Sequence, residues 1–203
     1  MSHEIHSSLA SEQVERNETA RLDGKTVIET LTPDEIDFWW PIYNEQFEEL
    51  NRENPCRQSF NRDEFEKAMV SPTMAKLAYV EGGEIVSMCL LSNDLDHFPW
   101  LSQEFYKDKY PDFFENDNIH YFVSLLTRQD KRNQSYAREV LELVTELYRL
   151  DDQNVIITFD CCAENAQWMP DMIAAIPDSM GQGSLGFEEV GTQHYFAGKL
   201  KLN

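Results

Sequence analysis

The fold is decided by the stretch Ile119 to Arg138, which has the sequence IHYFVSLLTRQDKRNQSYAR. Residues 119–127 form an apolar run that predicts a strand, and the apolar periodicity of residues 137–150 predicts a helix. A loop that leads into a helix binds anions well, because the first backbone N–H groups lack intrahelical acceptors and the helix dipole favours negative charge. The loop also concentrates basic residues, namely Arg128, Lys131, Arg132 and Arg138. We therefore predict an anion-binding loop, with a solvated helix start as the alternative.

The chain as a whole is strongly acidic. Its 203 residues carry a formal net charge of -20, and 41% of them are hydrophobic, which is enough to bury a sizeable core in one domain. This charge opposes binding to nucleic acid and to anionic membranes, and it attracts cationic substrates. The alternative, which we favour, is that the acidity maintains solubility. We expect no nucleic-acid partner and no membrane partner.

The cysteines indicate a reducing compartment. Cys56, Cys89, Cys161 and Cys162 lack the paired spacing of a zinc site, and two adjacent cysteines form a disulfide poorly, so free thiols and no metal are predicted. No apolar stretch approaches the roughly 20 residues that span a bilayer, and the N-terminus lacks a secretion signal. The expected location is cytoplasmic.

The first half of the chain contains clear helix starts. Residues 1–24 are polar and predict a mobile N-terminal tail, whereas residues 25–203 predict a single domain. Residues 25–31 alternate as a half-buried strand does. Thr32 then opens a helix over residues 32–50, and Pro41 within it should kink or break this helix. Further elements are a helix capped by Asn61 and ending at Ser71, and a hairpin of residues 76–80 and 84–91 around Gly82 and Gly83.

Residues 92–118 form an aromatic-rich insertion. A connection of this length is uncommon in a compact domain unless it covers a surface, binds a ligand or is disordered. Its aromatic residues argue against disorder, and Ser102 is placed to open a short helix. We favour a structural flap over the sheet, with a substrate-contacting lid as the alternative. The aromatic residues are Phe98, Trp100, Phe105, Tyr106, Tyr110, Phe113 and Phe114.

The last third of the chain predicts a parallel strand pair. Residues 154–161 form a continuous apolar run that is typical of a strand buried on both faces. A strand, a helix and a second strand in succession place the two strands in parallel. A helix at residues 171–176 and closing strands at residues 187–190 and 192–200 complete the order. The prediction is an α/β fold, or α+β with a mixed sheet, that contains a central parallel strand pair.

This order of elements resembles the GCN5-related N-acetyltransferase (GNAT) superfamily over roughly residues 25–200. The cofactor loop of that family follows the pattern Gln/Arg-x-x-Gly-x-Gly/Ala between its fourth strand and a helix. Arg132 and Ala137 match this pattern, while Ser135 replaces a glycine and brings a Cβ and a hydroxyl to the loop. The resemblance implies acetyl-CoA as acyl donor and no metal. The cofactor-binding residues that it implies are Leu125, Thr127, Arg132, Asn133, Gln134, Ser135, Tyr136, Ala137 and Asn165.

The resemblance also implies direct attack of a substrate amine on the thioester in a ternary complex. The candidate catalytic residues are His120 and Asp160 as bases and Tyr195 as the acid, because the family's usual tyrosine is absent from residues 167–186. Each has a structural alternative: a strand-end histidine bonded to backbone, a hydrogen-bonded carboxylate and a core tyrosine.

The predicted function is acetyl transfer to an unidentified, possibly cationic, small-molecule or peptide amine. A homodimer is compatible with the resemblance. Two alternatives from other classes remain open at this point. One is a non-catalytic acyl-CoA-binding module, which Ser135 and the missing tyrosine favour. The other is a protein-interaction module that uses the aromatic insertion as its docking surface.

Overall fold

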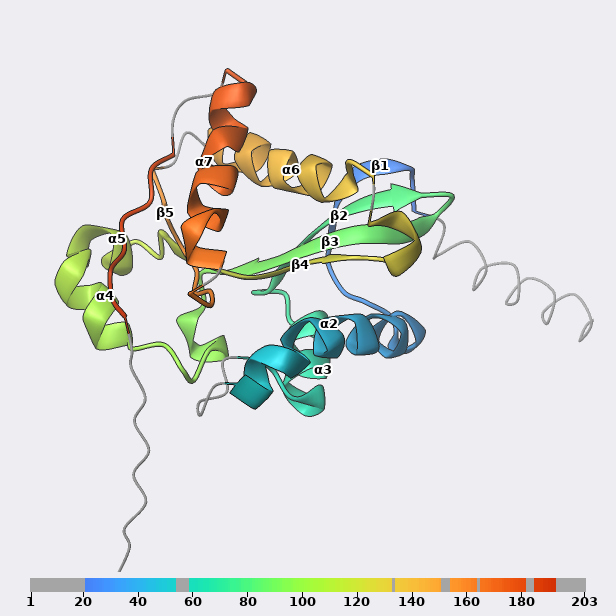
Figure 1. Cartoon of the computed structure of the whole chain (residues 1–203), viewed down its shortest axis with the longest axis horizontal. Coiled ribbons are helices and arrows are strands. Elements are labelled where there is room, and N and C mark those ends of the chain that lie inside the picture. Colours follow the sequence, from blue (N-terminus) through green and yellow to red (C-terminus); the bar gives the residue numbers. More distant parts are fainter. Residues whose placement is uncertain are drawn as a thin grey trace, which may run out of the picture.

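The computed structural model describes residues 21–53, 59–132, 134–150, 154–163, 165–181 and 185–192. Residues 1–20, most of the predicted N-terminal tail, lie outside this set. The described residues form a five-stranded sheet in the order β1-β2-β3-β4-β5, with helices on both faces (Figure 1). The mixed α and β architecture predicted from the sequence is confirmed.

The sheet contains four antiparallel strands and one parallel neighbour. Its antiparallel pairs join β1 with β2, β2 with β3 and β3 with β4, and β4 pairs with β5 in parallel, which confirms the predicted parallel pair. The strands are β1 (Gly24–Ile28), β2 (Ala75–Glu81), β3 (Glu84–Ser92), β4 (Ile119–Thr127) and β5 (Ile156–Thr158).

Strand β5 is shorter than predicted. The sequence indicated a strand over residues 154–161 that is buried on both faces, but β5 has three residues and all three are only half-buried. It pairs with β4 over a short register, from Ile119 opposite Ile156 to Tyr121 opposite Thr158. The apolar run therefore predicted too long a strand, because the length of a strand depends on the number of residues that pair with its neighbour.

The β2–β3 hairpin and the helix caps follow the sequence prediction. Gly82 and Gly83 have φ values of +64° and +80°, which glycine adopts without steric cost. Asn61 and Glu64 form a capping box at the start of α3 (Arg62–Val70), with the Asn61 side chain accepting from the Glu64 N–H at 3.0 Å. Thr32 and Glu35 form a similar reciprocal pair before α2 (Pro33–Glu53).

Helix α2 continues through Pro41. The predicted break does not occur, because the helix spans residues on both sides of this proline, which itself is exposed. Proline removes one helical hydrogen bond, but Trp39 and Tyr43 on the inner side are each only 1% exposed and hold both halves of the helix against the sheet. Tertiary packing therefore overrides the local preference.

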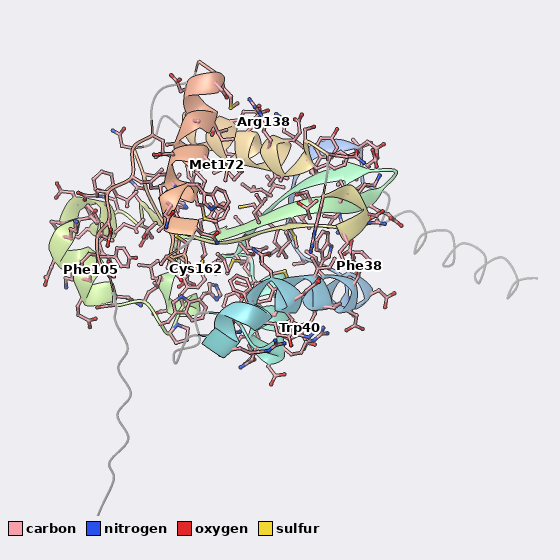
Figure 2. The ribbon with its side chains drawn as sticks, in the orientation of Figure 1. Phe38, Trp40, Phe105, Arg138, Cys162 and Met172 are labelled. Atoms are coloured by element: carbon pink, nitrogen blue, oxygen red, sulfur yellow. The ribbon has the colours of Figure 1, made fainter. Side chains whose placement is uncertain are left out.

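The core lies on both faces of the sheet. On one face, α2 and α3 contribute Trp39, Tyr43 and Phe65 to a large cluster. On the other face, α6 (Tyr136–Leu150) contributes Val140 and Val144 to a smaller one, and α7 (Met169–Ser179) packs beside it (Figure 1). Figure 2 shows Phe38 and Trp40 on the α2 side and Arg138 on the opposite, α6 side.

The insertion is structured and partly buried. It contains η1 (Leu95–His97), α4 (Gln103–Lys109) and α5 (Pro111–Glu115), and Ser102 caps α4 as predicted. Phe98 and Tyr106 are 1% and 6% exposed and belong to the large core cluster, so part of the insertion covers the sheet. Figure 1 places α4 and α5 beside β5.

The C-terminal region differs from its prediction. Helix α7 is longer than the residues 171–176 indicated by the sequence. Residues 187–190 do not form a strand. They contact the domain through side chains instead, since the Phe187 ring packs at 5.1 Å from that of Phe159 and Glu188 pairs with Lys109 at 3.0 Å. Residues 193–203, which include most of the other predicted closing strand and Tyr195, lie outside the described residues.

Candidate functional site

The site begins where β4 and β5 part. Their pairing ends at Tyr121 opposite Thr158, while β4 continues to Thr127. In the described part of the chain, Phe122 and residues 124–127 pair with β3 on one side and with no strand on the other. The N–H and C=O groups along such an edge are available to a ligand.

A bulge lies at the same point of β4. Leu90 pairs with Ser124 and Leu91 with Phe122, so Val123 is an extra residue in the strand. A bulge leaves its extra residue outside the regular ladder and bends the strand. The sequence analysis missed Val123, because no glycine or proline marks it and the register is set by β3, about 30 residues earlier along the chain.

A cavity of 440 Å³ lies along this open edge. Leu125 and Thr127 of β4 form one wall, and Arg132 and Ala137 lie where the loop enters α6. The structure thus brings together four of the predicted cofactor-binding residues. The opposite wall belongs to α2, which the sequence analysis did not assign to the site: Ile42, Glu45 and Gln46.

The start of α6 supplies backbone donors beside this cavity. The Ser135 carbonyl accepts the first helical hydrogen bond, from the Glu139 N–H at 3.0 Å. The N–H groups of Tyr136 and Ala137 therefore have no intrahelical acceptor, and the helix dipole adds positive potential. Serine is favoured just before a helix, which gives Ser135 a structural reason to stand where the GNAT pattern has glycine.

Asp160 lies at the other end of the open edge, two residues after β5. Its carboxyl group accepts a hydrogen bond from the Tyr121 hydroxyl of β4. Although part of the residue is open to solvent, the enclosure of the carboxyl group raises its pKa, and the Tyr121 hydrogen bond opposes this rise. Burial, followed by the nearby Asp160, raises the Tyr121 pKa well above its ordinary value.

The comparisons identify related folds. No protein-family model matches the chain, and no curated protein matches it. Among solved structures, a protein of Clostridium difficile 630 described as a possible acetyltransferase has a TM-score of 0.50 and 12% identity, covering 86% of this chain and 99% of its own. This chain has the GNAT fold.

Two further solved structures are less similar. A ribosomal-protein-alanine N-acetyltransferase of Brucella melitensis biovar Abortus 2308 has a TM-score of 0.47 at 8% identity, covering 85% of this chain and 98% of its own. An aminoglycoside 6'-N-acetyltransferase of Acinetobacter haemolyticus has a TM-score of 0.45 at 11% identity, covering 87% and 99%.

Within this GNAT fold, the basic side chains of the loop are already paired with carboxylates. Arg128 contacts Glu84 at 2.5 Å and Asp130 at 3.2 Å, and Lys131 contacts Glu81. Arg138 contacts Glu142 at 2.9 Å. Exposed pairs of this kind contribute little to stability, but each lowers the charge that an incoming anion meets.

The pair formed by Arg132 and Glu45 lies at the cavity. The distance between the Arg132 guanidinium and the Glu45 carboxylate is 3.6 Å, and both side chains are about half-exposed. Gln129 also donates to Glu45, at 2.7 Å. Glu45 therefore carries a negative charge at the place where the resemblance expects a phosphate group.

Other predicted cofactor-binding residues lie outside the cavity wall. The Tyr136 hydroxyl donates to Glu81 at 2.5 Å and its ring packs at 5.0 Å from that of Tyr79, so its side chain faces β2. Gln134 is exposed, and Asn165 lies in η3 (Asn165–Gln167). Asn133 is outside the described residues.

The predicted catalytic residues do not come together. The His120 ring packs edge-on at 5.0 Å from that of Tyr148 on α6, which is the face of β4 opposite to Tyr121, and burial lowers the His120 pKa. Asp160 contacts Tyr121 instead. Tyr195 lies outside the described residues, so its predicted role as the acid stays a prediction.

The described cysteines are free, as the sequence analysis expected. Cys89, Cys161 and Cys162 are free thiols, and burial raises the pKa of Cys89 and, less strongly, that of Cys161. Among the described ranges, no three His, Cys, Asp or Glu side chains are grouped as a metal site would require. No helix in this part of the chain is long and apolar enough to cross a bilayer.

Proposed function

We propose that this chain is an acetyl-CoA-dependent N-acetyltransferase that acetylates an amine by direct attack in a ternary complex. The observation that carries this proposal is the cavity along the unpaired edge of β4, which ends at the start of α6. The donor set suits an elongated ligand with an anionic end, because backbone groups line the edge and the first N–H groups of α6 have no intrahelical acceptor.

Different residues would bind different parts of acetyl-CoA. Leu125 and Thr127 would bind the pantetheine arm through their backbone groups, and the N–H groups of Tyr136 and Ala137 would hold the diphosphate. The bulge at Val123 leaves a backbone N–H to polarise the thioester carbonyl. When bound, acetyl-CoA supplies an activated acetyl thioester.

Asp160 is the candidate base. In the proposed reaction the amine nitrogen bonds to the acetyl carbon, the carbon–sulfur bond breaks, and the amine proton passes to Asp160 directly or through water. The departing thiolate then takes a proton, from Tyr195 or from water. We prefer Asp160 to His120, because His120 packs against α6 while Asp160 lies where the strands part.

The acceptor that we propose is a small-molecule or peptide amine that carries positive charge. The net charge of -20 would favour its approach. We also retain a cytoplasmic location, no nucleic-acid or membrane partner, and a homodimer as proposals that the fold leaves open.

The experiment that tests this function is a calorimetric titration of acetyl-CoA into wild type and into an Arg132→Ala, Ser135→Tyr double variant. We expect saturable one-to-one binding that is lost in the folded double variant. Thiol release with spermidine, glucosamine and a lysine-containing peptide then tests turnover. Wild type that binds no acetyl-CoA would remove the proposal.

A second candidate is a non-catalytic acyl-CoA-binding module. The absence of a tyrosine from residues 167–186 favours it, because the acid that would protonate the departing thiolate then has no usual residue. Binding without thiol release from any amine would select this candidate. The protein-interaction alternative receives less support, because Phe98 and Tyr106 of the insertion are buried.

A further inference from the structure

The insertion reaches the candidate base through two hydrogen bonds. The Trp100 indole N–H donates to the Tyr121 hydroxyl oxygen at 3.1 Å, and the Tyr121 hydroxyl donates to Asp160 Oδ1. These three residues, which we call the carboxyl cluster, come from the insertion, from β4 and from the segment after β5. They are far apart in the sequence and meet only in the folded chain.

The direction of these hydrogen bonds is fixed by chemistry. An indole N–H can only donate, so the Tyr121 oxygen accepts from Trp100. A phenol has a single proton, which Tyr121 then directs to Asp160. The geometry thus favours the ionised carboxylate, which accepts this bond, over the protonated acid.

Packing holds the cluster in one arrangement. Tyr121 is 3% exposed, and its ring centroid lies 4.6 Å from that of Phe98 and 6.4 Å from that of Trp100. A second contact joins the insertion to β5, since the Tyr106 hydroxyl lies 3.0 Å from Thr158 Oγ1. The Tyr121 hydroxyl therefore has little freedom to leave Asp160.

We propose that Tyr121 and Trp100 are positioning residues that hold the Asp160 carboxylate at the point where β4 and β5 part. This inference rests on the proposed function. Tyr121 binds one oxygen of the carboxylate, and the carboxylate so held takes the proton of the acceptor amine. The aromatic insertion is then a part of the reaction centre, in addition to its role as a cover of the sheet.

The groups that interact with Asp160 come from three directions. Tyr121 of β4 is the titratable group that lowers the Asp160 pKa, and a backbone hydrogen bond at Asp160 lowers it further; Asp160 in turn raises the pKa values of Tyr106 of α4 and of the neighbouring Cys161. No ion pair to Asp160 exists among the residues that the structure describes. The protonation of Asp160 therefore depends on burial, which favours the neutral acid, and on the Tyr121 hydroxyl, which favours the carboxylate.

The test uses Tyr121→Phe and Trp100→Phe, with Tyr106→Phe as the matched control. Tyr106→Phe removes a hydroxyl from the same insertion and its bond to β5, but no bond to Asp160. Three readouts are needed: the Asp160 pKa from NMR of carboxyl-labelled protein, acetyl-CoA affinity by calorimetry, and the pH profile of thiol release with the best amine among spermidine, glucosamine and a lysine-containing peptide.

We expect Tyr121→Phe to raise the Asp160 pKa by about one unit and to lower kcat about tenfold. The acidic limb of the pH profile should move to higher pH by the same amount as the pKa. Trp100→Phe should shift the Asp160 pKa in the same direction and lower kcat about threefold, since the Tyr121 hydroxyl remains. Acetyl-CoA affinity should stay within about twofold. An unchanged Asp160 pKa in Tyr121→Phe, or an equal change in Tyr106→Phe, would overturn the inference.

The failure of the proposed function has a different outcome. If wild type binds acetyl-CoA but releases no thiol with any amine, acetyl transfer is removed. The Asp160 pKa then decides by itself whether Tyr121 positions this carboxyl group. Trp100→Phe, at a half-buried position, provides the same readout if Tyr121→Phe does not fold.

Discussion

The basic loop at residues 128–138 differs from Asp160 and Lys76 in how the charged groups are held. In the loop, cations lie at the surface and each of the four basic side chains has a carboxylate partner. Asp160 is bound by a tyrosine hydroxyl, and the buried Lys76 ammonium donates to the backbone carbonyls of Ser71 and Met74, at 2.8 and 2.7 Å. Charges in a low-dielectric site respond strongly to small changes, whereas paired surface charges respond weakly. Substitutions of the surface cations in the loop should therefore have smaller effects than substitutions of Asp160 and Lys76.

The largest effect should follow from Asp160→Asn. Removal of the candidate base should lower kcat at neutral pH by about 100-fold, while acetyl-CoA affinity changes by less than about twofold. Steady-state thiol release and calorimetry measure the two quantities. Asp130→Asn on the exposed loop is the matched control. Equal kcat values for Asp160→Asn and wild type would contradict the comparison.

The next effect concerns Lys76 and pH. Burial lowers its pKa from 10.5 to about 8, so the unfolded state binds more protons than the folded state between these values. Lys76 should therefore raise the free energy of unfolding by about 2 kcal/mol as the pH rises from 8 to 10.5. In urea titrations, Lys76→Met should remove this increase in the free energy of unfolding with pH, whereas Lys67→Met, at an exposed position of α3, should not change it. If the free energy of unfolding changes with pH equally in wild type and in Lys76→Met, the lowered pKa of Lys76 is refuted.

A smaller effect is expected from Arg132→Ala. Loss of one cation at the cavity should weaken acetyl-CoA binding about fivefold at low salt and less at high salt, because the interaction is exposed and screened. Arg52→Ala, on the exposed end of α2, serves as the control. Calorimetry at two salt concentrations measures the difference. A loss much greater than fivefold would mean that the loop side chains matter more than its backbone groups.

The smallest effect is an increase in affinity. Glu45→Gln removes the carboxylate that faces Arg132 and should tighten acetyl-CoA binding about threefold at low salt. Glu48→Gln, on the same helix and paired with Arg52, should leave the affinity unchanged. Weaker binding by Glu45→Gln would show that Glu45 supports the cofactor rather than competing with it.

The local features of this fold and the parallel β4–β5 pair were predictable from the sequence, whereas other long-range features were not. The capping box at Asn61, the Gly82-Gly83 turn and the helix after the basic loop depend on neighbouring residues, so short patterns predict them. The length of β5 and the continuity of α2 through Pro41 depend on packing with distant elements. A single sequence carries no direct signal for such contacts.

The site divides in the same way. Leu125, Thr127, Arg132 and Ala137 follow from the resemblance to a known pattern, and the structure places them around one cavity. The α2 wall, the bulge at Val123 and the partners of Asp160 were missed. Each depends on which strand or helix lies opposite, and no short pattern links Tyr121 to Trp100 or to Asp160.

The open edge of β4 has a consequence for self-association. An unpaired strand edge is a template on which a second copy of the chain could add a strand, and this is the usual start of aggregation through sheets. With a net charge of -20, two copies repel one another before their edges meet. The acidity of this protein should therefore oppose association of two copies through this edge, and concentrated salt would weaken that opposition.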